Sequence, residues 1–402
     1  MNNSMIRMQV IGLGAAGNKC AISLVQDDII PIDDVLLVNS TKKDIPQAFL
    51  TSGNVCIIGD DIGGCGQERN VGKQIAVDAI KTGNLDLESF VKPEVDTVII
   101  IASTEGGTGS GSAVVVAKYL RDVLDCTVII FAITGFGQFP RNIWNPLEYF
   151  KELQDNYHIE IVSNKAFLDD DDLAVHKSQP KAEAAANKEI GRRIKVLTGQ
   201  VIMPSEQNID LRDLRKLTKS TGWCNVEYRD IESRIKNKAA FNEILKEMID
   251  QTKSMDPTSP EERRLGVIIS LPENEMDSID HSFSVITNKY GIPYEMFKHI
   301  QISQERFIAF ISAGMKMPMD DIKGMYDAYR DMSGKVNKGK DEFFDQISEL
   351  DKEDEDDIFD LDDTKITQEK SRAAKASFFD SFGVAMKKDV EVPTVRKDLG
   401  NY

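Results

Sequence analysis

The opening of the chain carries glycines at the spacing of a nucleotide-binding turn. Gly12-Leu13-Gly14-Ala15-Ala16-Gly17 follows the apolar run IRMQVI and leads into a helical pattern. A G-x-G-x-x-G turn between a strand and a helix is typical of dinucleotide-binding folds. In a nicotinamide enzyme the second strand ends in an acidic residue that binds the ribose, whereas here VLLVNS ends in Asn39-Ser40. The pattern indicates a phosphate-binding turn and disfavours a nicotinamide oxidoreductase.

Two further glycine-rich loops follow strand-like segments. Gly106-Gly107-Thr108-Gly109-Ser110-Gly111 separates TVIIIAS from the helical pattern SAVVVAKYL, and Gly63-Gly64-Cys65-Gly66 follows NVCIIGD. Glycines allow several backbone amides to point inward, and the positive end of the following helix adds to their attraction for a phosphate. A phosphate chain can be held in this way without a lysine side chain. Three such loops predict a nucleotide site.

The segments around these loops alternate between strand-like and helix-like patterns. From residue 6 to about 134, runs rich in β-branched residues and apolar throughout alternate with helical stretches, which is typical of parallel strands buried on both faces. Right-handed crossovers place every strand-to-helix loop at one edge of such a sheet, so the glycine loops are expected to meet there. The predicted fold class is α/β, with a parallel, Rossmann-like sheet, helices on both faces, a long central helix and a smaller α+β C-terminal domain.

The pattern changes after residue 180. The later elements expected are helices at about 181–201, 210–220, 231–251 and 275–290, a strand near 223–229, and the strands LGVIISL, FKHIQIS and RFIAFISAG. The last two strands are separated by a short turn, which indicates a small mixed sheet. The domains predicted are a nucleotide-binding domain at 1–180, a central helix and loop at 181–222, an α+β domain at 223–316, C-terminal helices at 317–348 and an acidic, largely disordered tail at 349–402.

Composition limits the partners of the protein. A chain of 402 residues with 41% hydrophobic content fits two domains. The net charge of -17 repels nucleic acids and anionic membranes, so no direct binding to either is expected, and it favours Mg²⁺. Five scattered cysteines and four histidines lack zinc-ligand spacing and indicate reduced thiols. Without a signal-peptide pattern or an apolar stretch of ~20 residues, the protein is expected to be soluble and cytoplasmic.

Several strings resemble those of the tubulin/FtsZ superfamily. GGTGSG after a strand resembles the tubulin signature loop, and VIGLGAAGN resembles the first nucleotide loop of FtsZ. Gly64, Gly66 and Gly72 have the spacing of its third loop, and Asn187 in AAAN is similar to the asparagine that reads the guanine edge. Residues 208–214, NIDLRDL, resemble the synergy loop N-x-D-x-x-D. Because these strings also keep the family order, the chain resembles a divergent prokaryotic, plasmid or phage member.

The resemblance implies a polymerising GTPase. In this family subunits stack head to tail, and the synergy loop of one subunit reaches the γ-phosphate held by the next, so hydrolysis of GTP to GDP depends on polymerisation. The ligands implied are GTP or GDP and Mg²⁺, the latter held through the phosphates and by no dedicated protein ligands. The partner implied is a second copy of the chain. The residues implied to bind nucleotide are Gly12, Gly14, Ala15, Ala16, Gly17, Asn18, Asn39, Ser40, Gly64, Cys65, Gly66, Glu105, Gly106, Gly107, Thr108, Gly109, Ser110, Arg141, Asn164, Glu183 and Asn187.

The resemblance also implies catalytic roles for Asp210 and Asp213, assisted by Asn208. The two carboxylates are three residues apart at the start of a helix and lie on roughly one face. There they could orient or polarise an attacking water that Asn208 helps to position. The alternative is structural, with Asp210 capping the helix and Asp213 favouring its first turn electrostatically. The glycine loops favour the catalytic interpretation.

Three positions depart from the family pattern. Glu105 stands where the signature loop usually has one more glycine, and a carboxylate beside phosphates is unfavourable unless it points away or helps to hold Mg²⁺ through water. Glu183, four residues before Asn187, replaces the aromatic side chain that stacks on the base. The stretch FPRN at 139–142 replaces the family's F-E-G…R, which leaves its arginine, Arg141, or its asparagine to approach the ribose and phosphates.

The C-terminal region leaves the biological role open. The acidic run at 350–363 is either a solvated spacer or a lateral filament contact, and SFFDSFGVAM is expected to form a short amphipathic helix. Residues 391–397, EVPTVRK, are similar in outline to the adaptor-docking peptide of division-type FtsZ. Cell division and the segregation or positioning of plasmid or phage DNA are both possible roles. The alternative is a tubulin-like filament or regulatory protein that hydrolyses GTP weakly or not at all.

Overall fold

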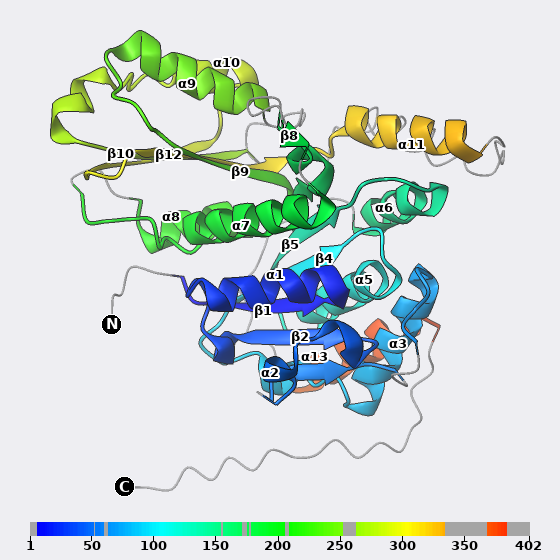
Figure 1. The fold of residues 1–402 in the computed structure, drawn as a ribbon. Helices are drawn as coiled ribbons and strands as arrows, with labels where there is room; N and C mark the ends of the chain where they lie inside the picture. The colour runs from blue at the N-terminus through cyan, green and yellow to red at the C-terminus, as the bar shows by residue number, and fades with distance from the viewer. Residues whose placement is uncertain are drawn as a thin grey trace, which may run out of the picture.

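One large sheet dominates the computed structural model of the chain (Figure 1). Ten strands form this sheet in the order β11-β10-β12-β9-β6-β5-β4-β1-β2-β3. A separate two-stranded sheet pairs β7 (Asp169–Asp170) with β8 (Val175–His176). The residues that the structure describes are 6–51, 53–59, 63–153, 156–170, 175–176, 178–205, 209–251, 263–333 and 368–383.

Six parallel strands form the N-terminal part of the large sheet. They are β1 (Met8–Leu13), β2 (Val35–Asn39), β3 (Val55–Ile57), β4 (Thr97–Ser103), β5 (Thr127–Thr134) and β6 (His158–Ser163). β1 and β2 are buried along their whole length, as expected for parallel strands with helices on both faces. The α/β fold class predicted from the sequence is confirmed.

Helices cover the two faces of this part separately. The helices whose apolar residues pack on one face are α1 (Gly14–Gln26), α7 (Gln179–Leu197) and α8 (Leu211–Lys219). Those on the other face are α3 (Arg69–Thr82), α5 (Gly107–Asp122) and α6 (Pro140–Leu153). Shorter helical segments are η1 (Ile32–Asp34), η2 (Lys42–Asp44), α2 (Gln47–Leu50), α4 (Leu87–Phe90) and η3 (Asn164–Phe167).

The C-terminal part continues the same sheet with mixed strand directions. Its strands are β9 (Gly222–Asp230), β10 (Arg264–Leu271), β11 (Glu295–Ile302) and β12 (Phe307–Met315). β12 is antiparallel to both β9 and β10, so the predicted mixed sheet is confirmed. Because β6 pairs directly with β9, the two parts share one sheet, and the domain boundaries proposed above remain an interpretation.

Helices of the C-terminal part differ in detail from the sequence-based expectation. They are α9 (Lys238–Gln251), η5 (Glu273–Ser278), α10 (Ser284–Tyr290) and α11 (Met319–Ser333). The helix expected from 231 begins only at Lys238, because the N–H of Ile235 donates to the buried carboxylate of Glu275 at 2.9 Å. The helix expected at 275–290 is interrupted at Phe283, which has a left-handed φ of 49°.

A buried charged cluster lies where β6 meets β9. Arg193 of α7 donates to Glu160 Oε2 at 3.3 Å and to Glu189 Oε1 at 3.1 Å, and both Arg193 and Glu160 are buried. Asn225 of β9 also accepts from Arg193, at 3.5 Å. Buried charges persist in proteins when they are paired. The central helix is therefore held to strands from both parts of the sheet.

A final helix, α13 (Gln368–Ser381), returns to pack against α5. The aromatic segment SFFDS, expected to be helical, lies in it. The remainder of the predicted tail, residues 349–367 and 384–402, falls outside the described part of the chain, as does the EVPTVRK segment. None of the helices within the described ranges is long and apolar enough to cross a membrane.

Backbone contact between α3 and α5 sets the geometry of the sheet edge. A Cβ at Gly72 of α3 would lie less than 3.0 Å from the carbonyl oxygen of Gly107, and one at Gly111 of α5 would be equally close to the carbonyl of Arg69. Gly17 of α1 approaches the carbonyl of Ile101 in the same way. Real Cβ atoms essentially never come so close to another atom, so these helices pack at a distance that only glycine permits.

We expect Gly72→Ala to lower the free energy of unfolding by about 1–3 kcal/mol, because the new methyl group forces α3 away from α5. The matched control is Gly324→Ala, in α11, where nothing lies within 4 Å of the added Cβ. That change should be neutral or stabilise by up to about 1 kcal/mol, since alanine favours helix. Urea unfolding of both variants would contradict the packing account if their stabilities changed equally.

Candidate functional site

The three glycine loops meet around one cavity at the carboxyl edge of the parallel strands. The cavity has a volume of about 300 Å³. The predicted residues that line it are Gly14, Ala15, Ala16, Asn39, Ser40, Gly64, Cys65, Gly66, Gly106, Gly107, Thr108 and Gly109. Gly12 and Gly17 lie behind this lining, where each packs closely against backbone. The expectation that the loops converge is confirmed.

The N-terminus of α5 faces this cavity. Gly106 is the N-cap of α5, and nothing lies within 4 Å of the position that a Cβ would occupy there. The first helical residues, Gly107, Thr108 and Gly109, line the cavity, and the first N–H groups of a helix have no partner within the helix. These donors and the positive helix end together favour an anion such as a phosphate.

Side-chain hydrogen bonds tie the loops to one another. Ser40 Oγ lies 2.7 Å from Thr108 Oγ1, and Thr108 Oγ1 donates to Cys65 Sγ at 3.3 Å. Asn145 of α6 donates from Nδ2 to the carbonyl oxygens of Glu105, at 2.8 Å, and Gln67, at 3.1 Å. The loops after β2, β3 and β4 therefore form one connected rim.

Sequence reasoning missed several residues of this rim. They are Leu13, Thr41, Asp44, Gly63, Gln67 and Ser103. Asp44 is the most consequential, because its carboxylate accepts a hydrogen bond from Asn39 Nδ2 at 3.4 Å and introduces an acidic group beside the cavity. One sequence signal could have identified two of these residues: Thr41 and Asp44 follow directly after the second strand, at the edge where the loops were expected to meet.

Asn18 and Ser110 lie behind the cavity. The buried Asn18 donates from Nδ2 to the carbonyl oxygen of Val38 at 3.1 Å, whereas its Oδ1 atom has no hydrogen-bond partner among the described residues. A buried polar atom is usually paired, so this Oδ1 departs from the usual pattern. Ser110 instead donates to the carbonyl of Gly106 and braces the first turn of α5.

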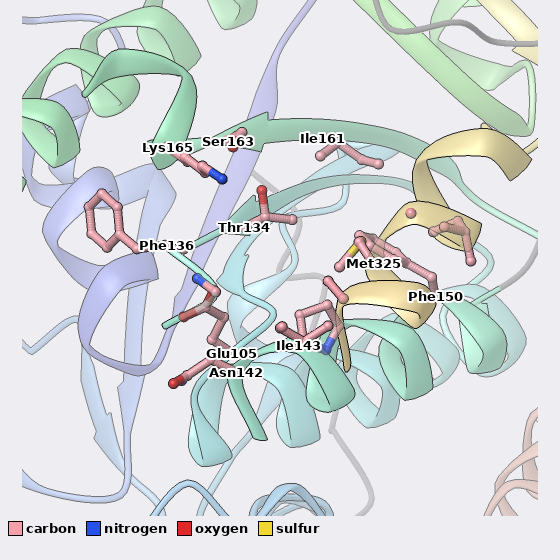
Figure 2. A pocket seen from close by; sticks show the side chains of 16 residues that line it. Glu105, Thr134, Phe136, Asn142, Ile143, Phe150, Ile161, Ser163, Lys165 and Met325 are labelled. Carbon is pink, nitrogen blue, oxygen red and sulfur yellow. The ribbon is translucent and has the colours of Figure 1, made fainter. Parts of the chain in front are cut away.

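Glu105 lies outside this cavity and lines a neighbouring one of about 390 Å³ (Figure 2). Its Oε1 accepts a hydrogen bond from the N–H of Gly137 at 3.0 Å. Burial raises the pKa of this carboxyl group, whereas the amides of residues 135–137 favour its charged form. A Cβ at Gly135 would come closer than 3.0 Å to the carboxyl group of Glu105. The loop after β5 thus accommodates the glutamate away from the cavity.

The remaining predicted nucleotide contacts lie around the rim or on α7. Arg141 donates to the carbonyl oxygen of Gly66 at 3.4 Å, beside the third loop. The buried Asn164 follows β6 at the same sheet edge. Glu183, on the first half of α7, pairs with Lys19 of α1 at 3.6 Å, and Asn187 is half-buried one turn later. None of the four lines the cavity formed by the glycine loops.

The acidic loop before α8 lies at the opposite edge of the sheet. Arg215 and Lys219 of α8 are each 3.8 Å from Asp96, which directly precedes β4, whereas Ser103 at the far end of β4 lines the cavity. At about 3.3 Å per residue the length of β4 separates the two edges by roughly 20 Å. Figure 1 shows α8 at the other end of the sheet from the start of α5.

Within one subunit Asp210 and Asp213 form a capping box. Asp210 accepts from the N–H groups of Arg212, at 2.7 Å, and Asp213, at 2.9 Å, while Asp213 Oδ2 accepts from the N–H of Asp210 at 3.3 Å. The structural alternative is therefore present in the isolated chain. Asp210 is exposed to solvent, and Asn208 lies outside the described residues.

Comparison with known proteins identifies the fold. No protein-family profile matches the chain. In sequence it is 24% identical over 240 residues to the cell division protein FtsZ of Methanothermobacter thermautotrophicus, which covers 58% of this chain and 59% of the relative. A GTPγS-bound protofilament of CetZ2 from Haloferax volcanii superposes with a TM-score of 0.64, covering 82% of this chain and all of the other. The chain has the tubulin/FtsZ fold.

A second structure extends this relationship to TubZ. A GTPγS-form protofilament of TubZ from Bacillus thuringiensis serovar israelensis superposes with a TM-score of 0.67 over 83% of this chain and 94% of the other, at 18% identity. The resemblance to the tubulin/FtsZ superfamily that the sequence predicted is thereby confirmed. The chain spans 53–59% of the length of the FtsZ relatives that head the comparison, at 23–25% identity.

A double-mutant cycle tests the accommodation of Glu105. Gly135→Ala should lower the free energy of unfolding by about 1–3 kcal/mol, because its methyl group displaces the carboxylate from the loop amides. In a Glu105→Ala background the same change should cost less than about 0.5 kcal/mol, since the clash is gone. Urea unfolding of the four proteins measures the coupling, and strictly additive effects would contradict the contact.

Proposed function

We propose that the protein binds GTP at the carboxyl edge of its sheet and hydrolyses it when copies stack head to tail in a filament. One observation supports the proposal: the glycine cavity and the acidic segment 209–213 at the start of α8 lie at opposite edges of the same sheet. A chain with this arrangement cannot bring the two together by itself, whereas head-to-tail stacking does so at every contact. CetZ2 and TubZ, which share the fold, are described as nucleotide-bound protofilaments.

The residues around the cavity fit a nucleoside triphosphate. Backbone amides at 14–16 and 106–109 would hold the phosphates, and the carboxylate of Asp44, which lines the cavity, would help to hold Mg²⁺ through water. The unpaired Oδ1 of Asn18 and the half-buried Asn187 are the polar groups proposed for the ribose and base. Glu183 is paired with Lys19, so the stacking partner for guanine is a side chain other than residue 183.

The acidic loop is the proposed source of the catalytic groups. Asp210 and Asp213, with Asn208, would orient and polarise the attacking water beside the γ-phosphate of the next subunit. Because loss of that phosphate removes contacts made across the interface, GTP favours assembly and GDP favours release. When bound, Mg²⁺ would neutralise part of the negative charge of the phosphates. Such a filament would suit either cell division or the segregation or positioning of DNA in a cytoplasm. An adaptor would bind the C-terminal tail.

A second candidate is a filament or regulatory protein with little turnover. The capping box favours it, because both carboxylates of the loop are occupied with the start of α8 in the isolated chain. The two proposals differ in how GTP turnover depends on assembly. In the first, the active site is shared, so GTP is hydrolysed only after subunits associate. In the second, the subunits would assemble with GTP and retain it without hydrolysis.

The test is phosphate release from GTP with Mg²⁺ over a series of protein concentrations, with sedimentation of the same samples. The proposal predicts one threshold concentration above which turnover and pelleted polymer both rise. Polymer without phosphate release would support the second candidate. Turnover proportional to concentration, with no polymer, would overturn the shared active site.

Asp213→Asn should reduce steady-state GTP turnover by about 100-fold, because it removes a carboxylate proposed to act on the attacking water. The amide oxygen can still accept from the N–H of Asp210, so the helix cap is retained. GTP binding should persist and the polymers should last longer. Asp86→Asn, at the N-cap of α4, is the matched control and should leave turnover unchanged. Loss of GTP binding in Asp213→Asn would show that the loop has been misassigned.

A further inference from the structure

The helix α13 is held against the N-terminal part of the protein by aromatic side chains. Phe378 is 1% exposed and meets the ring of Tyr119 edge-on, with ring centroids 5.0 Å apart. Phe379 and Phe382 pack on Phe378, each with its centroid 5.2 Å away. Aromatic rings bury a large apolar area in a defined geometry. The helix therefore carries an aromatic anchor that fits one place on α5.

Polar contacts at both ends of the anchor fix its register. Lys375 forms an ion pair with Glu88 of α4. At the other end Lys118 of α5 donates to Ser381 Oγ at 2.9 Å and lies over the ring of Phe382 at 5.5 Å. We call Glu88, Lys118 and Tyr119 the α5 docking surface. It recognises a helix with a lysine three residues before a buried phenylalanine.

Two residues of the α5 docking surface also contact each other. The hydroxyl of Tyr119 donates to Glu88 Oε1 at 2.5 Å, so the two residues that receive the helix are bonded to each other. Both residues belong to helices of the N-terminal part, α4 and α5, which precede α13 by more than 240 residues. This contact does not involve α13, so it supports the same surface when the helix comes from another molecule.

The connection to α13 is long enough for such an exchange. Residues 334–367, a stretch of 34 residues, separate the end of α11 from the start of α13, and Figure 1 shows these two helices well apart. Fully extended, this connection spans up to ~110 Å. A folded chain of this size has a radius of gyration of about 20 Å, so the reach exceeds one subunit. Within this connection, residues 351–363 carry nine carboxylates and one lysine.

We propose that α13 is an exchangeable docking helix that binds the α5 docking surface of a second copy of this chain as well as its own. An exchanged helix links two subunits through contacts that involve neither the glycine cavity nor the acidic loop. In a filament it would join neighbouring subunits or neighbouring strands. The exchange is independent of GTP, so it can be tested whether or not the proposed GTPase activity holds.

Crosslinking between full-length variants tests this exchange. One variant carries Lys118→Cys in the docking surface and the other carries Ser381→Cys in the helix, at positions whose side chains are in contact. An equal mixture is treated with a short bismaleimide and separated under denaturing conditions. We expect a crosslinked dimer in the mixture that neither variant forms alone, and a loss of at least ten-fold when Phe378→Ala is added to the Ser381→Cys chain.

Two controls make the outcome decisive. Lys246→Cys, at an exposed position on α9, replaces Lys118→Cys in a parallel mixture and corrects for random collision. The double variant Lys118→Cys/Ser381→Cys reports docking within one chain as a faster-migrating, internally crosslinked product. An internal product without a dimer in the mixture would overturn exchange. The absence of both products would overturn the docking of α13 itself.

Discussion

Backbone-to-backbone contact between α3 and α5 is the constraint on which the rest of the site depends. At Gly72 and Gly111 the two helices approach so closely that a single methyl group has no room. This contact brings the start of α5 up to the loop before α3, and hydrogen bonds through Thr108 then join both to the loop after β2. The three loops line one cavity as a consequence, and their backbone amides can attract a phosphate without a cationic side chain.

The strands that create this edge also separate it from the acidic loop. β4 runs from Thr97, directly after the Asp96 that pairs with α8, to Ser103 in the cavity, and its length is fixed by the extended backbone. Arg193 holds the central helix to strands of both parts of the sheet through buried ion pairs. The two ends of the subunit are thus held at a set distance, which suits a site assembled from two copies and opposes one assembled within a single chain.

Local patterns predicted the parts of this structure that depend on local chemistry. Alternating strands and helices gave the parallel sheet, and glycine spacing placed the three loops at one edge, as the cavity confirms. Local patterns could not predict contacts between segments that are distant in the sequence. Glu105 is accommodated by amides some thirty residues further along, and the start of α9 is delayed by Glu275, forty residues away. Neither partner has a sequence signal of its own, because each depends on how the loops meet in three dimensions.

The central claim is that one active site is built from two subunits, and complementation between two inactive variants tests it most directly. Gly106→Asp has room for its side chain and places a carboxylate at the glycine cavity, whereas Asp213→Asn leaves that cavity intact. The account predicts that neither variant alone releases phosphate from GTP, and that their mixture does, because the intact loop of one reaches the intact cavity of the other. An inactive mixture of the two folded variants would contradict it.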